Sequence, residues 1–181
     1  MTATIVTAAT TLPSLVTAQA THRPDALALS ARASDGQRYR LSYRVLDSAA
    51  CRYGEALADQ AVAADTRVGV LLSNDAALDC ILTALGAMTL SAAVVPLSPR
   101  WADAELEYAL TLTEPVLVVT DRAGLDRLAS LVPDLDCLSV EARPGMSSWQ
   151  PFSGDAPELP VDSEPAADLD RLASLLFTSG T

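Results

Sequence analysis

The sequence predicts an α/β fold, a mainly parallel sheet flanked by helices and preceded by an N-terminal β-hairpin. Three observations lead to this fold class. Short apolar runs typical of buried strands alternate with longer segments that carry an apolar stripe at helical spacing. An Asp35-Gly36 pair, which is a strong turn signal, separates two strand-like segments near the N-terminus. Half of the 181 residues are hydrophobic, so the chain can build a sizeable core.

The N-terminal elements are a helix, a hairpin and a longer helix. Apolar residues on one side of residues 12–21 predict the first helix, which ends before Pro24 because a residue preceding proline avoids helical geometry. Residues 26–31 and 38–43 predict the two hairpin strands on either side of the Asp-Gly turn. Apolar positions at helical spacing then predict a long helix over residues 43–63.

Strands and helices alternate from residue 68 onward. Residues 68–72 form a continuous apolar run, as expected of a strand buried on both faces, and Ser73-Asn74 is expected to cap the helix that follows. Asp103 and Glu105 place negative charge in the favourable first turn of a later helix. This alternation predicts parallel strands joined by right-handed crossovers. The remaining predicted elements are a helical stripe from Leu78 to Met88, helices at 103–112 and 124–131, and strands at 92–97, 116–120, 136–140 and 172–177.

The composition changes between residues 142 and 167. Five prolines in this segment, interleaved with glycine, serine and acidic residues, cannot hold a helix or a central strand. The segment 142–167 is therefore expected to be a long surface loop within one domain that covers residues 1–181.

Charge and cysteine usage exclude several classes of function. The net charge of −11 would repel nucleic-acid backbones and anionic membrane surfaces, and no apolar stretch is long enough to span a bilayer. Cys51, Cys80 and Cys137 lie far apart without metal-ligand spacing, so we expect reduced core thiols, no metal site and a cytoplasmic location. The only histidine, His22, is expected to be a surface or capping residue, and Trp101 a packing residue.

The last four residues, Thr178-Ser179-Gly180-Thr181, resemble the first half of a phosphate-binding loop. Small residues let backbone N–H groups approach an anion, and hydroxyls donate further hydrogen bonds to its oxygens. The apolar run before them predicts an inner strand, and ligand loops in α/β folds lie at the carboxyl ends of such strands. An ordinary polar turn is the alternative. The phosphate-loop interpretation requires Phe177 to lie in a sheet and Ser179 and Gly180 to lie outside a helix.

Seven segments, taken in order, resemble the AMP-forming adenylate enzymes, the superfamily of acyl-CoA synthetases, nonribosomal peptide synthetase adenylation domains and luciferases. The resemblance runs from about Leu12 to Thr181 and ends at the start of the motif TSGTTGxPKG. Two positions depart from the family pattern, because Ser91 stands at a usual glycine and Val45 at a usual acid, where we expect only a surface contact to be lost. The matching segments are His22–Ala28, Leu41–Leu46, Val68–Asn74, Ala84–Leu97, Glu105–Leu110, Val116–Asp121 and Leu175–Thr181.

The resemblance implies the incomplete N-terminal lobe of an enzyme that activates a carboxylic acid with ATP and passes the acyl group to a thiol. It implies ATP, Mg2+ and coenzyme A as cofactors, with Thr178, Ser179, Gly180 and Thr181 contacting the ATP phosphates. The remaining loop, including its lysine, and the catalytic and metal-binding residues are expected beyond Thr181, so the chain alone is expected to be inactive and to associate through an exposed apolar edge.

Three functions stay open at this point. The sequence Phe177-Thr-Ser-Gly-Thr favours the front part of an acid–CoA ligase over a peptide synthetase adenylation domain, which often has a tyrosine and a second serine there. A non-catalytic α/β module that binds a protein partner is the third. A nicotinamide-dependent oxidoreductase is excluded because its fingerprint needs glycines two and three positions apart, and no two of the eight glycines are that close.

Overall fold

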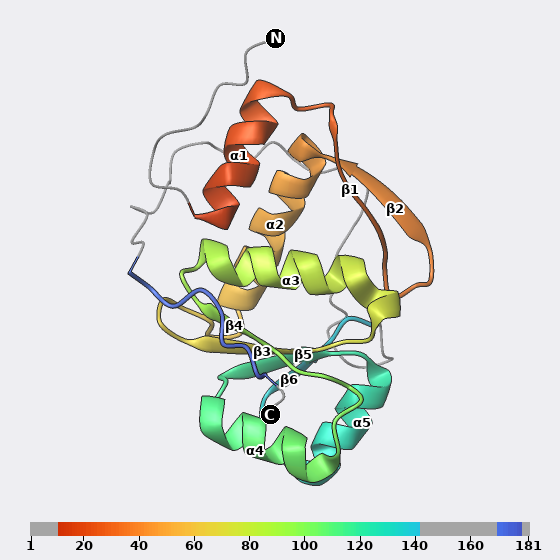
Figure 1. Cartoon of the computed structure of the whole chain (residues 1–181), viewed down its shortest axis with the longest axis vertical. Coiled ribbons are helices and arrows are strands. Elements are labelled where there is room, and N and C mark those ends of the chain that lie inside the picture. The colour runs from red at the N-terminus through yellow and green to blue at the C-terminus, as the bar shows by residue number, and fades with distance from the viewer. Residues whose placement is uncertain (1–10, 142–169, 179–181) are drawn as a thin grey trace.

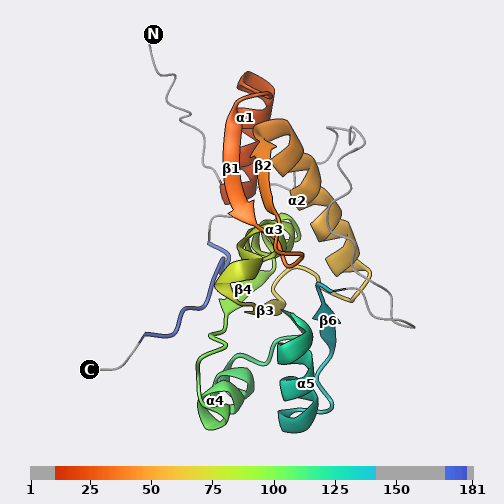
Figure 2. The same ribbon diagram turned by 90° about the vertical axis from the view of Figure 1, so that its right-hand side faces the viewer.

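The computed structural model describes residues 11–141 and 170–178. It has three layers, with a parallel sheet as the middle layer. Helices α1 to α3 and the hairpin lie on one side of the sheet, and α4 and α5 lie on the other (Figure 1). Figure 2 shows the same layers from the side. The helices are α1 (Leu12–His22), α2 (Tyr43–Ala58), the short 3-10 turn η1 (Asn74–Ala76), α3 (Ala77–Thr89), α4 (Asp103–Thr113) and α5 (Arg122–Leu131). The strands are β1 (Leu27–Arg32), β2 (Arg38–Ser42), β3 (Arg67–Leu71), β4 (Ala93–Pro96), β5 (Leu117–Thr120) and β6 (Cys137–Ser139).

The topology confirms the α/β fold class. Strands β1 and β2 form the antiparallel hairpin, and the four later strands pair in parallel in the order β4-β3-β5-β6. Helix α3 lies on the opposite face from α4 and α5, as right-handed crossovers require when the chain reverses its direction along the sheet. Among the described residues, no helix has both the length and the apolar character needed to cross a membrane.

Strand β3 is buried on both faces, as predicted. Val68 and Val70 pack into the apolar cluster beneath α2 and α3, whereas Leu71 packs into the cluster formed with α4 and α5. Neighbouring strands alternate in the same way, with Val94 and Val95 of β4 divided between the two clusters. The sheet is therefore the central layer of two cores.

Helices α2 and α3 cross at a pair of glycines. A Cβ atom built on Gly86 of α3 would lie 2.7 Å from the backbone nitrogen of Gly54 and 2.7 Å from the Cβ of Tyr53, both on α2. Such distances are far shorter than ordinary van der Waals contact, so only hydrogen atoms fit between the helices at this point. The missing side chains allow the two helices to pack backbone against backbone.

A buried carboxylate joins the hairpin to these two helices. Asp79 of α3 is 1% exposed, and its Oδ2 accepts a hydrogen bond of 2.7 Å from the backbone N–H of Ser34 in the hairpin turn. The hydroxyl of Tyr53 donates to its Oδ1 at 3.3 Å. Burial raises the pKa of Asp79 above its ordinary value, and the hydrogen bonds from Ser34 and Tyr53 partly oppose the rise.

Ser91, two residues after the end of α3, adopts the left-handed backbone conformation. Its φ is 59°, its N–H donates to the Met88 carbonyl at 3.1 Å, and the Ala92 N–H donates to the Ala87 carbonyl at 3.0 Å. These two bonds form a Schellman motif, in which the left-handed position is usually glycine. The family's preference for glycine at this position therefore has a conformational cause. The Cβ atom of Ser91 makes the left-handed conformation strained.

We expect Ser91→Gly to raise the free energy of unfolding by about 0.5–1 kcal/mol, because the left-handed strain exceeds the extra entropy of an unfolded glycine. Urea denaturation of the two proteins measures the gain. Ser91→Ala keeps the strain and removes only the hydroxyl, so it should show no gain. Equal stabilisation by both variants would contradict this explanation.

Two sequence predictions about helix ends were wrong. Helix α2 ends at Ala58 rather than residue 63, because the chain turns through a left-handed Ala61 to place the almost fully buried Val62 in the core. Ser73 does not cap α3 with its side chain, because the turn η1 intervenes and moves the start of the helix to Ala77. The predicted loop 142–167 lies outside the described residues.

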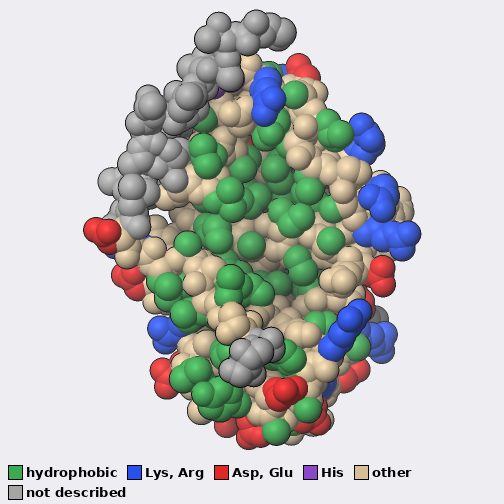
Figure 3. All heavy atoms as spheres, viewed as in Figure 1, with side chains coloured by type: hydrophobic (Ala, Val, Ile, Leu, Met, Phe, Trp, Pro, Cys, Tyr) green, Lys and Arg blue, Asp and Glu red, His purple; other side chains and the backbone are tan. Residues whose placement is uncertain are grey.

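Apolar side chains gather over the centre of one face, and charged side chains lie around its margin (Figure 3). Helix α3 crosses the centre of this view (Figure 1). Two large apolar residues of α4, Tyr108 and Leu112, are also more than half exposed. Self-association through apolar surface stays a prediction.

Candidate functional site

The segment 170–178 lies beside β4, outside the four-stranded sheet. Ser174 pairs in parallel with Val94, whose N–H donates to the Ala173 carbonyl at 3.0 Å and whose carbonyl accepts from the Leu175 N–H at 2.9 Å. An ion pair of 3.0 Å between Arg171 and Asp65 holds the start of the segment. Because the pairing is parallel, the segment ends at the same edge of the sheet as β4.

The prediction of an inner strand over residues 172–177 was wrong. Only Ser174 forms a bridge, Phe177 lies outside any sheet, and Leu176 is 73% exposed. Among the described strands, only β4 pairs with the segment, and Leu175 and Phe177 pack against the cluster under α4 and α5. An apolar run indicates burial, but it does not distinguish an edge segment from a central strand.

The predicted phosphate-contacting residues fall at the end of this segment. Thr178 is exposed. Ser179, Gly180 and Thr181 lie outside the described residues, so their expected contacts stay predictions. The position of Phe177 outside the sheet does not meet the requirement stated from the sequence, whereas the parallel direction of the segment agrees with a loop at the carboxyl edge.

The carboxyl edge is held together where β3 and β5 end. The buried hydroxyl of Thr120 donates to the Leu71 carbonyl at 2.8 Å and so joins the last residues of the two strands. The side chain of Asp121 accepts from the Gly124 N–H at 2.8 Å and caps α5. A Cβ on Gly124 would collide with the Thr120 hydroxyl, so glycine lets α5 begin directly against the strand end.

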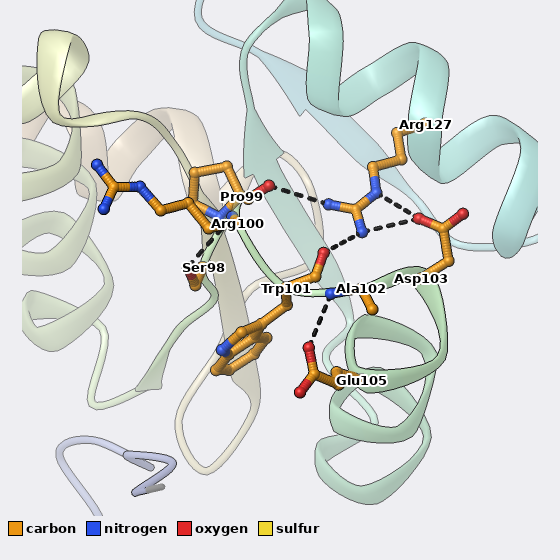
Figure 4. A network of polar contacts seen from close by, with 8 residues as sticks. All are labelled: Ser98, Pro99, Arg100, Trp101, Ala102, Asp103, Glu105 and Arg127. Carbon is orange, nitrogen blue, oxygen red and sulfur yellow. Dashed lines mark hydrogen bonds and ion pairs between the residues drawn. The ribbon is translucent and has the colours of Figure 1, made fainter.

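The turn between β4 and α4 is fastened by Arg127 of α5 (Figure 4). The Arg127 Nε donates to Asp103 Oδ1 at 2.8 Å, Nη1 to the Pro99 carbonyl at 3.2 Å and Nη2 to the Trp101 carbonyl at 2.6 Å. Glu105 accepts from the Ala102 N–H at 2.7 Å and completes the attachment of the turn to α4. All these contacts carry a charge, which makes them stronger than neutral hydrogen bonds.

Trp101 connects this turn to the segment 170–178. Its ring meets the ring of Phe177 edge to face, with centroids 5.4 Å apart and planes at 83°. Such aromatic pairs add about 0.5–1.5 kcal/mol beyond the area they bury. The prediction that Trp101 is a packing residue is confirmed by its contacts with the cluster under α4 and α5.

The cysteines are poor candidates for a nucleophile. All three are free, as expected. They are half-buried, whereas core residues were expected from the sequence. Burial, the main cause, raises the pKa of Cys80 and of Cys137 to about 11, and it also raises the pKa of Cys51. His22 is exposed at the end of α1, as predicted. Within the described ranges, no group of three histidine, cysteine or acidic side chains could hold a metal ion.

Sequence reasoning missed Arg127 and Asp79. The contacts of Arg127 reach 24 to 28 residues back along the chain, so no local pattern marks this residue. Asp79 had a usable signal, because it is an acid within the apolar stripe of α3.

Comparisons with known proteins agree on one family. The family described as AMP-binding enzyme matches residues 16–181. The phosphinothricin tripeptide synthetase PhsC of Streptomyces viridochromogenes is 30% identical over 78% of this chain and 12% of its own length. A medium/long-chain-fatty-acid–CoA/3-oxocholest-4-en-26-oate–CoA ligase of Mycobacterium tuberculosis is 30% identical over 52% of this chain and 17% of its own length.

A solved structure confirms the fold. VinN in complex with 3-methylaspartate matches 93% of this chain with a TM-score of 0.67 and 21% identity. The chain spans 44% of VinN and less than a fifth of the two relatives, so it corresponds to one part of those proteins. Because the family match covers nearly the whole sequence, the chain belongs to the AMP-binding enzyme family.

Proposed function

We propose that the chain forms the front part of an ATP-dependent ligase that joins a carboxylic acid to a thiol. In this reaction a carboxylate oxygen attacks the α-phosphorus of ATP, the bond to the β-phosphate breaks and pyrophosphate leaves. The thiol sulfur then attacks the acyl carbon, AMP leaves, and the thiol proton passes to solvent. Membership of the AMP-binding family supports this chemistry.

The observation that carries the proposal is the parallel bridge between Val94 and Ser174. It directs the segment toward the carboxyl edge of the sheet, where α/β folds bind their ligands. Thr178, exposed at the end of the described segment, has a hydroxyl available to a phosphate oxygen. We propose that Thr178, Ser179, Gly180 and Thr181 bind ATP phosphates and stabilise the negative charge that develops on them.

We propose that the residues that hold Mg2+ lie outside those described, and among the described residues no group of three histidine, cysteine or acidic side chains could hold a metal ion. Asp121, the carboxylate nearest the carboxyl end of β5, caps α5 instead. We therefore assign no step of the reaction to a metal held by this part of the protein.

Coenzyme A is the thiol that we propose first, because the sequence Phe177-Thr-Ser-Gly-Thr resembles acyl-CoA synthetases. An adenylation domain that delivers its acyl group to a carrier protein is the second candidate. The tripeptide synthetase PhsC supports it, because that match covers 78% of the chain and the match to the CoA ligase covers 52%.

The isolated chain is expected to give no ATP–pyrophosphate exchange with fatty, aryl or amino acids, since most of the proposed active site lies outside it. Incubation with labelled pyrophosphate, ATP, Mg2+ and each acid measures this. Acid-dependent exchange by the 181-residue chain would contradict the proposed division of the active site.

The coding DNA beyond Thr181 distinguishes the ligase from a non-catalytic module. We expect the frame to continue into Thr-Gly-x-Pro-Lys-Gly, and its product to catalyse exchange with at least one acid. A stop codon after Thr181 together with a stable monodisperse chain would favour the module. Supplying the active product with coenzyme A or with a phosphopantetheinyl carrier protein then identifies the thiol acceptor.

A further inference from the structure

The segment that leads to the proposed phosphate-contacting residues is held at its start by the ion pair of Arg171 with Asp65, and further along by β4 and the turn that follows β4. Its two backbone hydrogen bonds with Val94 lie at Ala173 and Leu175, and the Phe177 ring packs against the cluster under α4 and α5 and meets the Trp101 ring edge to face. Trp101 itself lies on a turn rather than on a helix or strand. The direction in which the segment leaves β4 therefore depends in part on whatever holds that turn in place.

Arg127 holds the backbone of the turn between β4 and α4. Its guanidinium donates to the carbonyls of Pro99 and Trp101, which lie two residues apart and so define the path of the backbone between them. The side chain is 24% exposed, and its bond to the Trp101 carbonyl is partly buried, whereas its bond to the Pro99 carbonyl is exposed. A planar guanidinium can reach both carbonyls and Asp103 at once, whereas an ammonium group cannot match that geometry.

We propose that Arg127 is a positioning residue that sets the segment 175–178 at the carboxyl edge by fixing the turn that carries Trp101. The path of the effect is short, from the guanidinium to the Trp101 carbonyl, from the Trp101 ring to Phe177, and from Phe177 to Thr178. That this segment contacts phosphate rests on the proposed function, but the positioning itself does not.

Arg127 also joins α5 to α4 through Asp103, with Nη2 and Nε both 2.8 Å from Oδ1. A purely structural role would act through this link alone. Asp103→Ala separates the two roles, because it removes the link and leaves the donors to Pro99 and Trp101 in place.

Hydrogen exchange of the intact 181-residue chain tests the proposal without any ATP chemistry. Arg127→Met is expected to speed exchange of the Leu175 amide about tenfold, while the amides of β3 and β5 keep their rates. Arg127→Lys should behave like Arg127→Met, because one ammonium group cannot replace the several N–H donors of the planar guanidinium. Asp103→Ala should change the Leu175 rate less than threefold, and Arg122→Met, at an exposed arginine of the same helix, should leave it unchanged.

A second measurement follows Trp101 directly. In a Trp149→Phe background Trp101 is the only tryptophan, and Arg127→Met is expected to raise its acrylamide quenching constant about twofold. An unchanged Leu175 rate in Arg127→Met would overturn the proposal. So would equal acceleration of the β3 and β5 amides, full rescue by lysine, or reproduction of the whole effect by Asp103→Ala. Failure of the ligase chemistry would leave these readouts as they are, so the two proposals fail separately.

Discussion

Replacing Gly86 with alanine is expected to lower the free energy of unfolding by about 3 kcal/mol, the upper end of the usual cost of overpacking a core. The added Cβ would meet the backbone nitrogen of Gly54 and the backbone carbon of Tyr53 at 2.7 and 2.8 Å. Backbone atoms cannot rotate away as a side chain can, so α2 and α3 must separate. Alanine gains about 1 kcal/mol over glycine in a helix, and the expected cost is net of that gain.

Thermal unfolding followed by circular dichroism measures this effect, and we expect a decrease in Tm of about 10 °C. Gly36→Ala is the matched control, because nothing lies within 4 Å of its added Cβ although its φ is 79°. That variant should lose about 1 kcal/mol through backbone strain alone. If Gly86→Ala were as stable as the native chain, the close approach of the two helices would be wrong.

Replacing Asp79 with alanine is expected to cost about 3 kcal/mol. The change leaves the partly buried Ser34 N–H without its acceptor, at about 1–3 kcal/mol, and removes side-chain volume from the core. Asp79→Asn keeps an oxygen for Ser34 and lets its amide group donate to the Tyr53 hydroxyl, so it should cost less than about 1 kcal/mol. Urea denaturation of the three proteins at pH 7 measures both costs. Equal losses in the two variants would show that the hydrogen bond to Ser34 does not matter.

Comparison of the native chain with Asp79→Asn also reports the raised pKa of Asp79. Between the ordinary value of 3.8 and the raised value, the folded state binds more protons at this site than the unfolded state. The contribution of Asp79 to stability therefore falls as pH rises through that window and stays constant above it. Denaturation between pH 4 and 7 should show Asp79→Asn gaining stability relative to the native chain as pH rises. A constant difference would mean that the pKa is not raised.

The layers of this fold could be predicted from local patterns because each pattern reports a local property. The continuous apolar run of β3 reflects burial on two faces, and the Asp35-Gly36 pair reflects the geometry of a tight turn. The glycine preference at position 91 was visible as a departure from the family pattern. Its cause, a left-handed helix end, was visible only in the backbone.

The candidate site was harder to predict because its residues meet through long-range contacts. The run Leu175-Leu176-Phe177 is equally apolar whether it lies inside a sheet or at its edge, and only the neighbours of β4 decide between them. Arg127 resembles any solvent-facing arginine until α5 folds back onto the turn after β4. Val45 was expected at the surface, yet it packs partly against the core beneath α2.

The bridge between Val94 and Ser174 joins residues eighty positions apart, whereas β3 and β4 pair across about 26 positions. Closing the longer loop costs more chain entropy and gains only a few contacts in return. Pairings of high contact order are formed slowly. We therefore expect the helices and the four-stranded sheet to fold first, and the segment 170–178 to attach last, onto a scaffold that is already complete.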